Sequence, residues 1–237
     1  MAHILYIFPH PDDESFGPAP LMARQRRQGH RVSLLTLTRG EATRQRAKYG
    51  YSKEKMGAIR FEEMQAVARA LDLNDLTVLD FPDGDLPRVN ARTLETAIAD
   101  HIRRLQPGVV VTYPVHGISG HPDHMVTHRV VKRVYRTLKK VSAPFLQRLA
   151  FYTLPEENRT GRSDHLMGSP PEDIHCIVPI ADDDLARGHA ALECYTTYRD
   201  VIEEQQPLKT LADGICFSFY EETYLPPLDD LCAGLAA

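Results

Sequence analysis

Two short segments of this 237-residue chain combine imidazole and carboxylate side chains at close spacing. The first reads HPDDE at residues 10–14, and the second reads HPDH at residues 121–124. Two imidazoles and two or three carboxylates that converge on one crevice match a catalytic zinc ion, which takes three protein ligands and keeps a fourth position for water. Consecutive carboxylates would repel phosphate, so the first segment favours a cation or proton transfer over the pyrophosphate that a glycine-rich turn binds.

The second segment carries little weight by itself. Pro122 lacks an N–H and suits the first position of a helix, so His121 precedes that helix and His124 lies in its first turn. Both imidazoles can therefore face one crevice, but such a histidine pair is more often structural or solvent-facing than a metal site. The metal interpretation depends on the two segments meeting in space.

Apolar runs alternate with helical patterns along the chain, which predicts a doubly wound, Rossmann-like α/β fold with a mostly parallel sheet and helices on both faces. Strands are predicted at 3–8, 32–38, 76–81 and 109–113, with strand-like stretches at 148–154, 174–180 and 216–224. Helices are predicted at 18–28, 53–71, 91–105, 122–140 and 183–203. The expected core stripe of the helix at 53–71 is Ile59, Met64, Val67 and Leu71.

This architecture predicts where the two segments lie. Open α/β sheets bind ligands beyond the carboxyl ends of their strands, at the point where the strand order reverses. In a 3-2-1-4 order, the first and fourth strands meet at that point. HPDDE follows the first strand and HPDH comes shortly after the fourth, so we expect both segments to line one crevice.

Composition limits the class of protein. With 43% hydrophobic and 25% charged residues, we expect one domain over 1–237, made of a motif-bearing core at 1–140 and a C-terminal extension at 141–237. A net charge of −4 argues against a nucleic-acid partner. The chain has no apolar run of ~18 residues, no basic signal-peptide start and no C-x-x-C pair, so we expect a cytoplasmic protein without a membrane partner. A basic segment from Arg24 to Lys48 is either a solvated surface or a collar that attracts an anionic substrate.

The two segments resemble the signatures of the PIG-L/LmbE-like zinc deacetylases, which remove acetyl groups from N-acetylglucosamine units of small thiol precursors, glycolipid precursors and related glycosides. This chain has FPHPDDESFG at 8–17 and GHPDH at 120–124. Weaker similarities are TRGE at 38–41, R-x-x-E at 60–63 and FPDGDL at 81–86. The resemblance runs from residue 3 to about 140, in the family's order and spacing.

The resemblance implies that His10, Asp13 and His124 bind one zinc ion per chain. It also implies that Asp12 is the general base. The physical chemistry agrees, because zinc can lower the pKa of a bound water to ~7 and polarise an amide carbonyl, while a neighbouring carboxylate takes the proton.

Four more residues receive roles from the resemblance. His121 would stabilise the oxyanion and protonate the leaving amine, with Asp123 orienting it. Arg60 and Asp83 match positions that look like contacts to sugar hydroxyls. The alternatives are a helix-surface charge for Arg60 and the acid of a tight turn for Asp83.

Several neighbours keep two interpretations. Glu14 is either the partner of a metal ligand or a carboxylate favoured at a helix start. His128 and His116 could reach the site, although packing or surface roles are favoured for both. Arg39 and Glu41 could pair over Gly40 or touch a ligand. The remaining histidines are expected to be structural: His3, His30, His101, His165, His175 and His189.

The chain departs from the family pattern at three places. Residues 17–20 replace a glycine-rich run, Ser119 replaces an aromatic residue, and Tyr195 replaces a histidine. These departures leave the metal ligands intact and bear on the substrate.

The sequence therefore predicts a zinc-dependent N-deacetylase that acts on an N-acetylglucosamine-type small molecule, such as a low-molecular-weight thiol precursor, with a homo-oligomer possible. One alternative is a metal-dependent phosphoesterase, which usually needs two metal ions and a richer ligand set. Another is a non-catalytic, metal-containing binding protein, against which the intact Asp12 and His121 argue.

Overall fold

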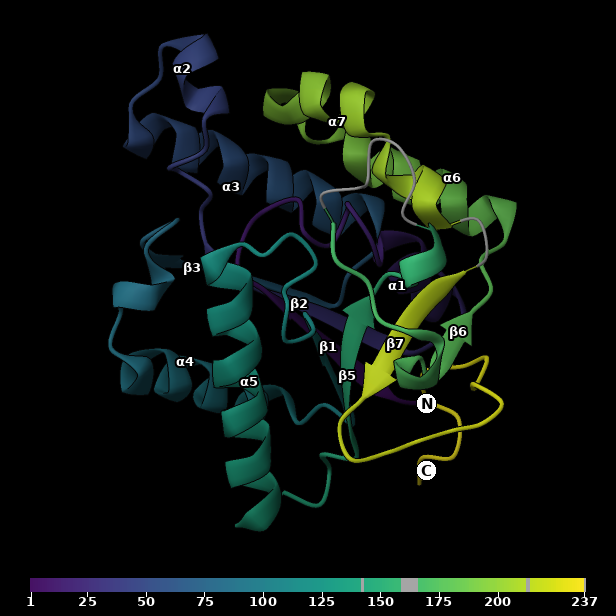
Figure 1. Cartoon of the computed structure of the whole chain (residues 1–237). Helices are drawn as coiled ribbons and strands as arrows, with labels where there is room; N and C mark the ends of the chain where they lie inside the picture. Colours follow the sequence, from purple (N-terminus) through teal and green to yellow (C-terminus); the bar gives the residue numbers. More distant parts are fainter. Residues whose placement is uncertain (142, 159–165, 212–213, 237) are drawn as a thin grey trace.

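A seven-stranded sheet forms the centre of the protein in the computed structural model, which describes residues 1–141, 143–158, 166–211 and 214–236. The strands are β1 (His3–Phe8), β2 (Arg31–Thr38), β3 (Asp75–Phe81), β4 (Val109–Thr112), β5 (Arg148–Thr153), β6 (Cys176–Val178) and β7 (Ile215–Phe219). Their order is β3-β2-β1-β4-β5-β7-β6. The strands from β3 to β5 pair in parallel, and β7 is antiparallel to both β5 and β6. The predicted 3-2-1-4 order is confirmed, and the C-terminal strands extend the same sheet (Figure 1).

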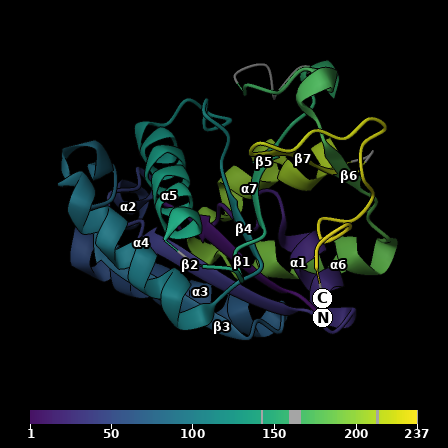
Figure 2. The ribbon, with the colours of Figure 1, turned by 90° about the horizontal axis from the view of Figure 1, so that it is seen from below.

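The central strand β1 is buried on both faces because its side chains alternate between two cores. Ile4, Tyr6 and Phe8 pack in the core that α1, α3 and α6 cover. Leu5 and Ile7 pack in the core under α4 and α5 (Figures 1 and 2). These helices are α1 (Ala19–Arg27), α3 (Lys53–Ala70), α4 (Ala91–Leu105), α5 (Pro122–Lys140) and α6 (Asp182–Glu193). The predicted α/β class with helices on both faces is therefore confirmed, and none of the described helices is long and apolar enough to span a membrane.

The single helix predicted at 183–203 is wrong, because the chain breaks after α6. A 3-10 turn at Thr196–Tyr198 follows, and then α7 at Arg199–Gln205. Glu63 of α3 causes the break: its carboxylate accepts the Thr197 N–H and the hydroxyls of Thr196 and Thr197, each at 2.8 Å. Helical periodicity could not reveal this contact, since Glu63 lies 134 residues before Thr197.

Helix α3 buries a different stripe from the expected one. Met64, Val67 and Leu71 are buried as predicted, whereas Ile59 is half-buried. Before Met64, the buried positions of α3 include two charged residues. These positions are Met56, Gly57, Arg60 and Glu63. Charged residues replace apolar ones there because α3 faces polar groups at the carboxyl end of the sheet.

The segment between β2 and α3, where no helix was predicted, contains a short helix, α2 (Gln45–Tyr49). The basic segment does not form one collar, because Arg26 pairs with Asp72 and Arg27 with Asp184. Those pairs neutralise charges in the amino-terminal part of the segment. His165 lies outside the described residues.

Candidate active site

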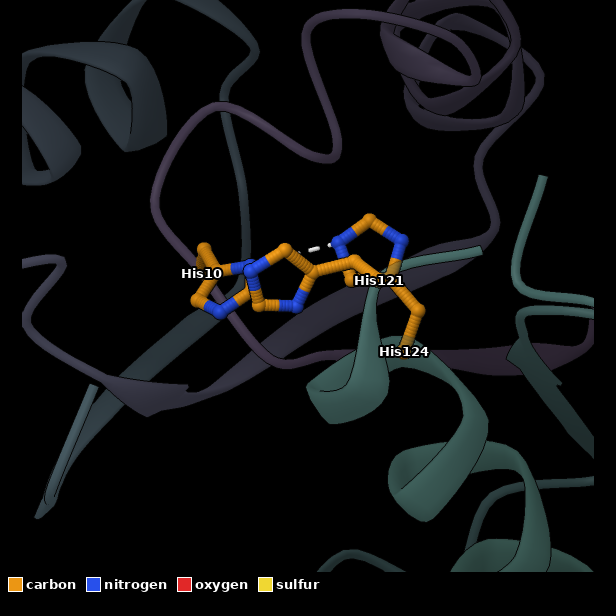
Figure 3. A group of neighbouring side chains, drawn as sticks. All are labelled: His10, His121 and His124. Carbon is orange, nitrogen blue, oxygen red and sulfur yellow. Dashed lines mark hydrogen bonds between the residues drawn. The ribbon is translucent and has the colours of Figure 1, made fainter. Parts of the chain in front are cut away.

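The two polar segments meet at the carboxyl ends of β1 and β4, which are parallel neighbours in the sheet. HPDDE follows β1 directly, and HPDH opens α5 after a loop. His121 caps α5, because its Nδ1 accepts the Asp123 N–H at 3.2 Å. Figure 3 shows His10, His121 and His124 gathered at one place from the two segments. The predicted convergence of the two segments is present in the fold.

The three expected metal ligands lie close together, and Asp13 faces each imidazole with a different oxygen. His10 Nδ1 lies 3.2 Å from His124 Nε2, and the two oxygens of Asp13 lie 3.6 Å from His10 Nδ1 and 3.4 Å from His124 Nε2. Ligand atoms ~2.0–2.2 Å from a tetrahedral zinc ion are roughly 3.3–3.6 Å apart. The donor types and spacings therefore fit a zinc ion with three protein ligands.

Each of these ligands is held by a further hydrogen bond. His124 Nδ1 lies 2.9 Å from the Gly117 carbonyl, which makes Nδ1 the donor and leaves the Nε2 lone pair for a metal. His10 Nε2 lies 3.1 Å from Asp123 Oδ2. Tyr113 donates its hydroxyl to Asp13 Oδ1 at 2.7 Å. The ligand set is thus oriented before a metal binds.

The pKa values of the ligands follow from burial and from mutual contacts. Burial by itself would lower the pKa of His10, but its hydrogen bonds with Asp123 and Asp13 outweigh burial and raise that pKa to about 10. Burial would raise the pKa of Asp13, but His124 and the bond with His10 lower it to about 2. Burial lowers the pKa of His124 to about 4. At neutral pH, His10 is therefore the one ligand of the three that must lose a proton to a metal.

Asp12 stands beside the ligands in a strained backbone conformation. Its φ is +86°, in the left-handed region that residues with side chains rarely adopt. Arg60 Nη2 donates to Asp12 Oδ2 and to the Pro11 carbonyl, both at 2.7 Å. Burial raises the pKa of Asp12 to about 6, and Arg60 opposes that rise. A carboxylate with such a pKa can exchange a proton near neutral pH.

Arg60 has a contact that the sequence did not predict. The residue is only 1% exposed, and its guanidinium lies 4.0 Å from the Tyr198 ring centre. This burial excludes a helix-surface charge, and the sugar contact stays a prediction. Arg60 instead binds the carboxylate of Asp12, because α3 turns this position toward the end of β1.

Asp123 and Asp83 also differ from their expected contacts. The carboxylate of Asp123 faces His10 and accepts the N–H groups of Gly84 at 2.9 Å and Leu86 at 3.2 Å, whereas only its backbone N–H reaches His121. The side chain was expected to orient His121, but it orients His10. The carboxylate of Asp83 accepts the Ala42 N–H at 2.7 Å and lies 3.3 Å from His10 Nε2. These contacts do not test a role in substrate binding, which stays a prediction.

Several residues with two interpretations now have clear surroundings. Glu14 is fully buried and accepts the hydroxyl of Tyr195. His128 packs on Phe151 and its Nδ1 lies 2.9 Å from the Tyr113 carbonyl, so it is a core residue. Other contacts are local: His116 accepts the Ile118 N–H, Arg39 pairs with Asp80, and Glu41 accepts the Asp83 N–H.

Two residues that shape the site were not predicted from the sequence. Tyr113 ends the apolar run of β4 and was assigned to that strand, yet its hydroxyl holds Asp13. Gly117 has φ +64°, and a Cβ there would lie 2.7 Å from His124 Cβ. The glycine-bearing loop before HPDH was the available signal for Gly117, whereas nothing in the sequence pointed to the hydroxyl of Tyr113.

Comparison with known proteins shows which family and which relatives the chain resembles. The family model described as PIG-L: GlcNAc-PI de-N-acetylase matches residues 5–135. A probable N-acetyl-alpha-D-glucosaminyl L-malate deacetylase 2 of Bacillus subtilis is 33% identical over 144 residues, which cover 60% of this chain and 64% of the relative. A 1D-myo-inositol 2-acetamido-2-deoxy-alpha-D-glucopyranoside deacetylase of Thermomonospora curvata is 34% identical over 151 residues, which cover 55% of this chain and 51% of the relative. The match thus spans between half and two thirds of these relatives.

Solved structures share the fold at low sequence identity. A conserved protein from Thermus thermophilus has a TM-score of 0.66 at 23% identity, covering 95% of this chain and 98% of that chain. GalB, a 4-carboxy-2-hydroxymuconate hydratase, has a TM-score of 0.66 at 14% identity, covering 94% and 98%. Because a hydratase also has this fold, the fold by itself does not identify the reaction, and the side chains of the site must be considered.

Proposed function

The chain belongs to the PIG-L family, and from that membership and the site geometry we propose that it is a zinc-dependent N-deacetylase of an N-acetylglucosamine-type small molecule. The names of its relatives support an N-acetylglucosamine unit in the substrate, since both the malate-linked and the inositol-linked substrates carry an acetylated glucosamine. One observation carries the proposal: the two imidazoles of His10 and His124 lie 3.2 Å apart, with an oxygen of Asp13 within 3.6 Å of each, beside the buried, arginine-bound carboxylate of Asp12.

His10, Asp13 and His124 are the residues that would hold the zinc ion. A zinc ion at this site would polarise the acetamide carbonyl and acidify a water molecule. Asp12 accepts the proton of the attacking water. Among the described residues Arg60 engages Asp12 Oδ2, so Oδ1 remains to receive this proton.

His121 would supply a hydrogen-bond donor for the oxyanion that forms from the amide carbonyl. Its Nδ1 accepts the Asp123 N–H, so the proton of the neutral ring sits on Nε2. Burial and the nearby charge of His10 lower the pKa of His121, which keeps the ring neutral at pH 7. The neutral ring can donate a hydrogen bond from Nε2–H to the oxyanion, but losing that proton would leave an imidazolate. When the C–N bond breaks, the leaving nitrogen therefore takes the proton that Asp12 removed from the attacking water, and Asp12 returns to its ionised form.

Asp123 and Asp83 act in this proposal around the reacting groups. Asp123 is a positioning residue for His10, because its carboxylate meets His10 Nε2 and two backbone N–H groups. Asp83 is the expected contact to a sugar hydroxyl, at the edge of the same cluster. We further propose that the protein acts in the cytoplasm as one domain over 1–237, as the sequence predicts.

A two-metal phosphoesterase is less well supported. The described residues contain two groups that could hold a cation: His10 with His121 and His124, and His10 with Asp83 and Asp123. Filling both groups would require the one imidazole of His10 to bridge two metal ions. The hydrogen bond between His10 Nε2 and Asp123 uses that nitrogen for orientation instead.

The proposal is tested by release of primary amine from N-acetylglucosaminides with malate, inositol and simple aglycones. We expect release that a chelator abolishes and zinc restores. Asp12→Ala should keep zinc and lose turnover, whereas Asp13→Ala should lose both. Zinc-loaded protein that releases no amine from any of these substrates, or Asp12→Ala with normal turnover, would contradict the proposal.

A further inference from the structure

The strained backbone of Asp12 is held by local and by distant contacts. Locally, its carbonyl accepts the N–H groups of Ser15 and Phe16, each at 2.8 Å. Its φ of +86° is costly for a residue with a Cβ, and such strain persists only when surrounding contacts hold it. Arg60 holds one end of the residue, through the carboxylate and the preceding carbonyl of Pro11. The other end is the peptide N–H, which donates to the hydroxyl of Tyr195 at 2.8 Å.

The hydroxyl of Tyr195 is a link between two groups of the HPDDE segment. It accepts the Asp12 N–H and donates to Glu14 Oε1 at 2.7 Å. Met64 Sδ, at 2.8 Å, is a weaker acceptor for the same proton. Tyr195 is 1% exposed and Glu14 is fully buried, so no solvent water can replace these bonds.

Tyr195 reaches this position because of the break between α6 and the 3-10 turn. Its ψ of +72° leaves the helical region, and the adjacent Thr196 and Thr197 are bound by Glu63 of α3. The same helix α3 carries Arg60, whose guanidinium lies 5.7 Å from the Tyr195 ring centre. Helix α3 thus supports both of the distant contacts of Asp12, those with Arg60 and with Tyr195.

We propose that Tyr195 and Glu14 are positioning residues for Asp12, and that their hydrogen bonds hold its backbone in the left-handed conformation that aims the carboxylate. The proposal rests on the function proposed above, in which Asp12 is the base. A hydroxyl suits this link because it accepts one hydrogen bond while donating another. Glu14 acts here as an acceptor, so its role requires an oxygen atom and not a charge.

The test compares Tyr195→Phe with Tyr6→Phe. Tyr6 is also fully buried and donates its hydroxyl to Gln25 at 2.9 Å, but it has no contact with Asp12, so it controls for the loss of one buried hydrogen bond. For Tyr195→Phe we expect kcat to fall about 10- to 100-fold with little change in KM, and zinc content to stay at one per chain. Tyr6→Phe should keep its kcat.

A second readout does not depend on activity. Hydrogen exchange of the peptide that spans residues 9–16 should be about two- to tenfold faster in Tyr195→Phe than in wild type or Tyr6→Phe, because the Asp12 N–H has lost its acceptor. Glu14→Gln keeps an acceptor oxygen and should retain most of kcat, whereas Glu14→Ala should resemble Tyr195→Phe.

Three results would overturn the inference: wild-type kcat and exchange in Tyr195→Phe, an equal loss of kcat in Tyr6→Phe, or Glu14→Gln as impaired as Glu14→Ala. If wild-type protein released no amine at all, the proposed function would fail separately. The exchange of residues 9–16 would still decide whether Tyr195 holds this segment.

Discussion

Arg60→Met should move the acid limb of the pH profile of kcat/KM upward. In the wild type, burial raises the pKa of Asp12 to about 6 and Arg60 opposes this rise. The Arg60 guanidinium stabilises the ionised carboxylate across 2.7 Å in a site where both groups are largely buried. Methionine fills much of the same volume without a charge, so the variant removes the opposing effect and keeps the packing.

The size of the shift follows from the contact. Two unit charges about 4 Å apart interact by about 4 kcal/mol at an effective dielectric constant of 20, and a neighbouring arginine typically lowers an aspartate pKa by about 1–3 units. Without Arg60, the pKa of Asp12 should therefore rise to the neutral or alkaline range. Because the base works only when ionised, kcat/KM at pH 7 should fall about 2- to 100-fold through the pKa shift and recover in part as the pH is raised. The loss that remains at high pH would reflect the missing hydrogen bonds from Arg60 to Asp12 and Pro11.

The assay is amine release between pH 5 and 10 by the zinc-loaded protein, with metal content and melting temperature measured in parallel. Arg39→Met is the matched control, since Arg39 follows β2 on the same side of the sheet and pairs with the well-exposed Asp80. The control should keep the wild-type acid limb. A folded, zinc-loaded Arg60→Met variant with an unshifted acid limb would refute the role assigned to this contact.

Three further predictions concern the metal site. His124→Ala should lower zinc affinity by orders of magnitude in a metal-binding titration, since it removes one of three ligands; an unchanged affinity would exclude His124 as a ligand. At pH 6.5, zinc binding should release about one proton, because the pKa of His10 of about 10 keeps this ligand protonated in the metal-free protein. Calorimetry in buffers of different ionisation enthalpy measures the number of protons released. A number near zero would argue against His10 as a ligand. Gly117→Ala should weaken zinc binding and destabilise the fold by about 1–3 kcal/mol, because its φ of +64° and the approach of His124 leave no room for a Cβ; wild-type thermal stability and affinity would contradict this.

The order of the sheet was predictable because local signals agreed with one another. The apolar runs at 3–8 and 109–113 are too hydrophobic for a half-exposed strand, which places both at the centre of a parallel sheet. Once those two strands are neighbours, the segments that follow them must meet at one edge. The expected ligand set of His10, Asp13 and His124 needed only this topology and the residue types.

The surroundings of the ligands were less predictable, because they depend on residues that are distant in the sequence. The pattern R-x-x-E at 60–63 suggested a sugar contact and an unassigned acid, but Arg60 binds Asp12 and Glu63 binds the turn at Thr196–Tyr198. Helical periodicity says which residues share a face of α3, and it does not say which polar partner that face meets.

The sequence by itself determined the chemistry: histidines and carboxylates at the ends of two neighbouring strands, which suit a zinc ion and a general base. The tertiary structure alone decided how that base is controlled. Arg60, 48 residues from Asp12, and Tyr195, 183 residues from it, reach the same aspartate from α3 and from the break after α6. Strand ends are fixed by short-range patterns, whereas these side-chain pairs are fixed by the packing of one helix against another, which local sequence does not encode.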